Sequence, residues 1–166
     1  MRSILPTLVF LVISVWPAFG QLGAAKPAAV SDPRVQKVLD QAGLKSSVDG
    51  DGDYRMNNEV PDGRSQLVWI LSNTSKLGSL EIREVWSIAY KSPKPFSAEL
   101  ANRLLNENCK TKVGSWQMQK MGEDFVAVFS AKIAAETDSA SLATIIDAVA
   151  KTADKMEQEI STGDDL

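Results

Sequence analysis

Histidine is absent from this sequence of 166 residues, and cysteine occurs once, as Cys109. Without an imidazole, every mechanism that needs histidine as a base or a metal ligand is excluded. A lone cysteine cannot form an internal disulfide, so a core must hold the fold. Cys109 has only Lys110 and Lys112 as nearby cations. We therefore interpret it as a structural or partly buried thiol just past a helix end rather than a nucleophile. If exposed, it would offer an intermolecular disulfide.

An excess of positive charge is also missing. The chain has 18 Lys and Arg against 21 Asp and Glu, a formal net charge of −3, and its cations are scattered singly among acids. A basic stripe would be the footprint of phosphate binding. We therefore expect no nucleic-acid partner and weak attraction to anionic membrane surfaces.

The longest apolar run covers residues 4–16, about 13 residues, whereas a membrane-spanning helix needs about 20. It follows a basic residue and precedes small ones, which is the pattern of a secretory signal peptide. We predict a signal peptide over 1–20 with cleavage between Gly20 and Gln21. No stable membrane anchor would remain, and the protein would be periplasmic or secreted. An Ala- and Pro-containing linker over 21–31 would precede the folded part.

The rest of the chain, 32–163, reads as a single domain followed by a polar tail, 164–166. A short helix is predicted from the cap Asp32 to the terminator Gly43. Strand pieces follow on both sides of an Asp-Gly turn, then strands over 66–72 and 80–90. The connection between the last two is predicted over 73–78. Leu80, Ile82, Trp86, Ile88 and Tyr90 are expected on one face.

Ser97 is a cap for a second helix that ends near Asn108, with Leu100, Leu104 and Leu105 facing inward. Two more strands are predicted over 113–120 and 125–133, with a turn at Gly122. A long amphipathic helix, capped by Asp138 or Ser139, runs to Gly163. The element order is α-β-β-β(-β)-α-β-β-α. This order predicts an α+β fold in which helices pack on one face of an antiparallel sheet of about five to six strands.

No catalytic residue, metal ligand or cofactor site is predicted. Asp49, Asp51 and Asp53 have the spacing that opens a calcium loop, but Tyr54 stands where glycine is required and Val60 where a bidentate glutamate is required. We interpret them as a hairpin turn. The carboxylates nearest apolar segments show no spacing that would bring two together for acid–base work; they are Glu81, Glu84, Glu107, Glu123 and Asp124.

Tryptophans on the predicted strands are the candidate binding surface. Trp69, Trp86 and Trp116 either fill the core, the usual role, or line a groove for a partner. An exposed one among them would therefore mark a contact surface.

Four stretches, together with the element order, are similar to the YbjN family, which is described as bacterial sensory transduction regulators. They are VDGDGDY over 48–54, LLNEN over 104–108, GSWQM over 114–118, and Ala153-Asp154. The resemblance implies a fold like that of type III secretion chaperones. It also implies a domain that binds protein segments without catalysis, commonly as a homodimer.

Three hypotheses follow for function. The first is an exported, non-enzymatic protein-binding or chaperone-like module whose partner the sequence does not identify. The second is a carrier of a small apolar ligand held in an enclosed pocket between the sheet and the last helix. The third is a hydrolase that uses two converging carboxylates.

Overall fold

The computed structural model describes residues 29–160. The predicted signal peptide, the cleavage point between Gly20 and Gln21, most of the linker and the tail 164–166 lie outside the described residues. So does Gly163, the predicted end of the last helix. Among the described residues, no helix is both long and apolar enough to cross a membrane.

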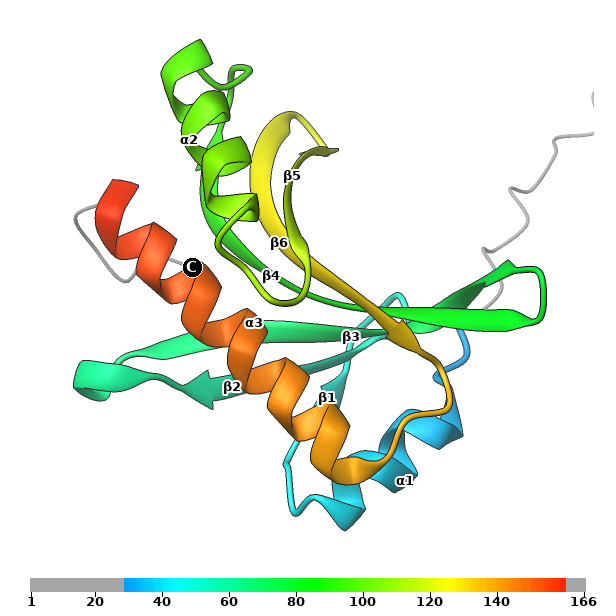
Figure 1. Cartoon of the computed structure of the whole chain (residues 1–166). Coiled ribbons are helices and arrows are strands. Elements are labelled where there is room, and N and C mark those ends of the chain that lie inside the picture. The colour runs from blue at the N-terminus through cyan, green and yellow to red at the C-terminus, as the bar shows by residue number, and fades with distance from the viewer. Residues whose placement is uncertain (1–28, 161–166) are drawn as a thin grey trace, which may run out of the picture.

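Six antiparallel strands form one sheet, and three helices lie on one of its faces (Figure 1). The strand order is β1-β2-β3-β4-β6-β5. This confirms the predicted α+β class. The elements are α1 (Pro33–Gln41), β1 (Ser47–Val48), β2 (Tyr54–Glu59), β3 (Ser65–Leu77), β4 (Leu80–Ser92), α2 (Ala98–Asn108), β5 (Ser115–Met121), β6 (Asp124–Ala134) and α3 (Ser139–Ile160), with a 3-10 turn over Pro61–Gly63.

The core lies between the sheet and α3, which crosses it diagonally (Figure 1). Alternate residues of β2, β3, β4 and β6 point toward α3, so strands with period-two patterns meet a helix with an apolar stripe. The completely buried members include Ile70, Val85, Phe129, Ile146 and Val149. α1 packs beside α3, and α2 packs against β5. The opposite face of the sheet has no helix over it among the described residues.

The predicted helix starts are confirmed. The carboxylate of Asp32 accepts from the Arg34 backbone N–H at 2.9 Å, and the Ser97 hydroxyl accepts from Leu100 N–H at 3.2 Å. Asp138, rather than Ser139, caps α3. One helix prediction is wrong, because Leu105 is 62% exposed while Leu104 is buried. Only Leu104 and Leu100 lie on the side of α2 that meets the core.

The connection predicted over 73–78 is also wrong. β3 continues to Leu77, and the turn into β4 occurs at Gly78, where φ is +60°. Both arms of this hairpin extend into solvent (Figure 1). Strands that extend into solvent need no buried apolar face. The polar residues of 73–77 therefore lack the alternation that marks a strand, and their composition is typical of a loop. A register shift at Ala89 in β4 also places Tyr90 on the opposite face from Trp86 and Ile88.

A buried arginine joins α1 to the sheet. Arg83 is 2% exposed and donates to Asp32 Oδ2 at 2.6 Å. It also donates to the carbonyl oxygens of Leu71 and Ser72, which lie where the β3–β4 register shifts. The Ser72 hydroxyl in turn accepts from Asp32 N–H at 3.0 Å. Arg83 thus supplies donors to two backbone carbonyl groups in the irregular part of the β3–β4 ladder.

Replacing Arg83 with methionine should lower the free energy of unfolding by about 3 kcal/mol, because Asp32 and two carbonyl groups would lose a buried donor. Urea denaturation measures the change. Arg55→Met is the matched control, since Arg55 is exposed on β2 and should change stability by less than about 0.5 kcal/mol. Equal effects of the two substitutions would contradict the structural role assigned to Arg83.

The free energy of unfolding should decrease as the pH is lowered, because the carboxyl pKa values of Asp32 and Glu81 are lower in the folded protein than in the unfolded chain. Hydrogen bonds from Arg34, then Arg83, hold the pKa of Asp32 well below 3.8. Hydrogen bonds from Arg34 and Thr74 lower the pKa of Glu81 from 4.5 to about 2. A depressed pKa stabilises the fold above the unfolded value, and this contribution is lost as pH falls through the folded value.

We therefore expect the free energy of unfolding to decrease from about pH 5 toward pH 2. Burial raises the pKa of Asp53, which opposes this trend and makes the slope shallower. Urea denaturation across that range measures it, with Glu81→Gln as the comparison. If the Glu81→Gln protein lost stability as steeply as the original, Glu81 would not contribute.

Candidate binding surface and pocket

Trp69 and Trp86 lie together on the sheet face opposite α3. They are direct cross-strand partners on β3 and β4, with ring centroids 4.6 Å apart and planes within 10°. Both are partly exposed, and neither belongs to the core cluster. Stacked aromatic pairs add stability to a sheet beyond their buried area. Their rings therefore form a rigid apolar surface in contact with solvent.

The neighbours of the pair extend this surface. The sheet register places Leu67 and Ile88 beside the tryptophans, whereas Val128, the partner of Ile88 on β6, is fully buried. We call the surface made by Leu67, Trp69, Trp86 and Ile88 the helix-free face. No described helix packs on it.

Trp116 does not belong to the helix-free face. It is 5% exposed, lies on the side of the sheet that α2 and α3 cover, and contacts the Phe129 ring at a centroid distance of 5.2 Å. Of the three tryptophans considered as a possible binding surface, the structure brings two together and places the third in the core. Strand alternation explains this, because Trp116 is paired with Phe129, a core residue.

The carboxylates considered for acid–base work are dispersed. Glu81 pairs with Arg34, Glu84 with Lys132, Glu107 with Lys110 and Asp124 with Lys91, while Glu123 is exposed beside a turn. Two others do converge: Asp154 and Glu157 of α3 are buried and both bond Arg64. The guanidinium group of Arg64 therefore places a positive charge beside both carboxylates. Sequence reasoning missed this pair because Arg64 is distant in the chain.

The hairpin interpretation of the aspartates is confirmed. Asp49 Oδ1 accepts from the backbone N–H groups of Asp51 and Asp53, and Asp53 Oδ1 accepts from Ser72 N–H. Two of these carboxylates therefore hold the turn and its contact with β3. Cys109 follows the end of α2, as predicted. It is exposed, so the expectation that it is partly buried is wrong.

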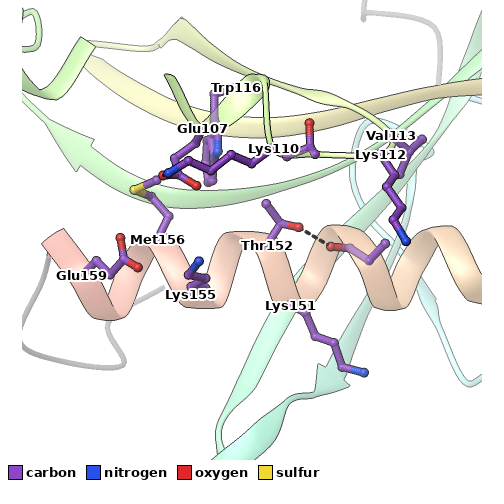
Figure 2. Close-up of a pocket in the computed structure, with 12 residues that line it drawn as sticks. Glu107, Lys110, Lys112, Val113, Trp116, Lys151, Thr152, Lys155, Met156 and Glu159 are labelled. Atoms are coloured by element: carbon purple, nitrogen blue, oxygen red, sulfur yellow. Dashed lines mark hydrogen bonds and ion pairs between the residues drawn. The ribbon is translucent and has the colours of Figure 1, made fainter. Parts of the chain in front are cut away.

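A pocket of about 420 Å³ lies between the α2–β5 loop and the second half of α3 (Figure 2). Four lysines line it: Lys110 and Lys112 from the loop, and Lys151 and Lys155 from α3. We call it the lysine pocket. Val113, Trp116 and Met156 supply its apolar wall. Cations that are scattered along the sequence are thus gathered at one site by the fold.

The loop wall of the lysine pocket is held firmly. The side-chain oxygen of Asn108 accepts from Trp116 N–H at 2.6 Å, and the Thr111 hydroxyl donates to the Asn108 carbonyl at 3.1 Å. Gly114 has φ +77°, and a Cβ there would lie 2.8 Å from the Ser130 carbonyl oxygen. Only glycine allows this close approach of the loop to β6. The wall is therefore formed before any ligand arrives.

A second apolar surface lies beside α2. Leu105 and Met118 are 62% and 53% exposed, and with Leu104 and Phe96 they line a shallow pocket of about 180 Å³. We call Leu105 and Met118 the α2–β5 patch.

Comparison of the chain with family models, with curated proteins and with solved structures finds no match. The YbjN resemblance and the likeness to type III secretion chaperones therefore stay predictions from the sequence. The function is therefore inferred from the geometry of the helix-free face and the lysine pocket.

Substituting either partner of the tryptophan stack should remove its excitonic circular-dichroism band. We expect Trp69→Ala and Trp86→Ala each to abolish the band, and the lost pairing to lower the free energy of unfolding by about 1 kcal/mol. Trp116→Phe is the control and should keep the band, because Trp116 is not stacked on either ring. Retention of the band in Trp86→Ala would contradict the stacked arrangement.

Proposed function

We propose that this protein is a non-enzymatic protein-binding module of the chaperone-like or regulatory kind, acting outside the cytoplasm after removal of residues 1–20. The partner would dock on the helix-free face. The single observation that supports this most is the stacked, partly exposed pair of Trp69 and Trp86 on the face opposite all three helices.

The chemistry of the pair suits protein recognition. Tryptophan is enriched among the residues that dominate binding energy at protein interfaces, because its large ring loses water contact at small cost in conformational freedom. Each ring already restricts the other, so little further ordering is needed on docking. Leu67 and Ile88 on either side would enlarge the apolar contact.

The edges of the sheet offer a second mode of contact. β1 pairs with β2 only at Ser47 and Val48, so the outer side of β2 beyond Arg55 has no strand neighbour among the described residues. β5 is the edge strand at the other end. An extended segment of a partner can add to such an edge by backbone hydrogen bonds while its side chains reach a sheet face.

The other two hypotheses have less support. The lysine pocket carries too many cations for a neutral apolar ligand, since a polar lining lowers rather than raises affinity for one. The buried Asp154 and Glu157 are bonded by Arg64 and do not line the pockets found beside α3.

The test is quantitative affinity capture from the source cells with four proteins: the unaltered chain, Trp69→Ala, Trp86→Ala and Leu105→Ala. Leu105 is an equally apolar, exposed residue on the α2–β5 patch and serves as the matched control. We expect one protein to be retained by the unaltered chain and by Leu105→Ala, and to be reduced about 30-fold or more by either tryptophan substitution, the effect of a residue worth about 2 kcal/mol.

Light scattering over a range of concentrations tests the homodimer that the resemblance implies. A dimer that Trp86→Ala dissociates would identify a second copy of the chain as the occupant of the helix-free face. Retention lost only in Leu105→Ala, or no retained protein together with a monomer at every concentration, would overturn the proposal.

A further inference from the structure

The charges around the lysine pocket do not cancel. Lys110 pairs with Glu107, and Lys151 pairs with Asp147 at 2.8 Å. Glu159, the other acid of the lining, pairs with Arg103 of α2. Lys112 and Lys155 form no ion pair with any residue of the described part of the chain. Two positive charges therefore remain at the site in a protein whose net charge is negative.

A buried donor also lacks an acceptor at this site. Trp116, a lining residue that is 95% buried, has an indole N–H that makes no hydrogen bond to any residue between 29 and 160. Buried indole N–H groups usually find an acceptor, because leaving one unpaired costs free energy. Figure 2 shows the indole among the lining side chains at the end of the pocket where Glu107 and Met156 lie.

The remaining wall is apolar, and Figure 2 shows Met156 near Trp116 and Lys155, and Val113 near Lys112 at the opposite end. Val113 from the loop and Met156 from α3 line the same volume. A pocket of this kind, with polar groups beside an apolar wall and a volume of about 420 Å³, has the size and chemistry of small-molecule sites.

From this arrangement we propose that the lysine pocket binds a small amphipathic organic anion. Lys155 holds its charged group, and the Trp116 indole N–H donates to one of its oxygens. Its apolar part packs on Met156 and extends toward Val113, where Lys112 adds a further positive charge. Lysine presents a point charge with three donors, so a carboxylate and a phosphate both satisfy this chemistry. The site lies on the helix-covered side of the sheet and is independent of the helix-free face.

Titration with matched eight-carbon probes tests the proposal. Octanoate and octyl phosphate carry the anion, octanol is the neutral control and octyltrimethylammonium is the cationic control. The readout is the indole N–H resonance of Trp116 in ¹H–¹⁵N spectra, assigned from the signal that disappears in Trp116→Phe. We expect saturable shifts of this resonance with one or both anions and not with octanol or the cation. A preference between the two anions identifies the head group.

Variants locate the charge. Lys155→Ala should raise the dissociation constant of the anion about fivefold, as expected for one partly exposed ion pair. Lys112→Ala should raise it less, because Lys112 lies at the opposite end of the pocket from Trp116 (Figure 2). Lys37→Ala removes the same charge from the exposed surface of α1 and should leave it unchanged. Trp86→Ala should also leave it unchanged, so failure of the protein-binding proposal would not affect this result. Retained spectral dispersion verifies that each variant is folded.

Three results would overturn the proposal. They are the absence of a saturable Trp116 shift with both anions, an equal shift with octanol, and an equal loss of affinity in Lys37→Ala and Lys155→Ala.

Discussion

The buried Arg83 side chain connects three parts of the chain that would otherwise be independent. Its guanidinium group binds Asp32 at the start of α1 and the carbonyl oxygens of Leu71 and Ser72 in β3. The irregular register of β3 and β4, the position of α1 and the hairpin turn bonded to Ser72 therefore depend on one another. Desolvation offsets much of the attraction in a buried ion pair of this kind, whereas removing one partner costs more because it leaves the other group without its partner.

The two faces of the sheet have different roles. The face toward α3 is closely packed with aliphatic residues and the rings of Tyr54, Trp116 and Phe129, and three helices cover it. The other face presents the stack of Trp69 on Trp86 without a covering helix among residues 29–160. An antiparallel sheet can keep one face in solvent, but a tryptophan pair is a costly choice for that position unless it meets a partner. This asymmetry places the proposed protein contact and the lysine pocket on opposite sides of the molecule.

The lysine pocket shows how a site can form without a sequence motif. Lys151 and Lys155 are four residues apart and share a helix face, which the sequence alone indicates. Nothing in the sequence brings Lys112 to them. The loop that carries Lys112 reaches α3 because Gly114 permits close packing on β6. The side-chain oxygen of Asn108 also accepts a hydrogen bond from the backbone N–H of Trp116 near the start of β5. The buried Trp116 is part of that same junction.

Local patterns determined the helices, their caps and the two hairpins at Gly52 and Gly122, because caps, turns and apolar periodicity act over a few residues. They also led to the correct α+β class. Tertiary structure decided which side of the sheet the helices cover, and so which tryptophans are exposed: Trp116 faces the helices, whereas Trp69 and Trp86 face away. It also decided that β3 and β4 extend through a polar hairpin and that four lysines distant in the sequence line one pocket. These outcomes depend on strand register and on contacts between distant residues, which no local pattern specifies.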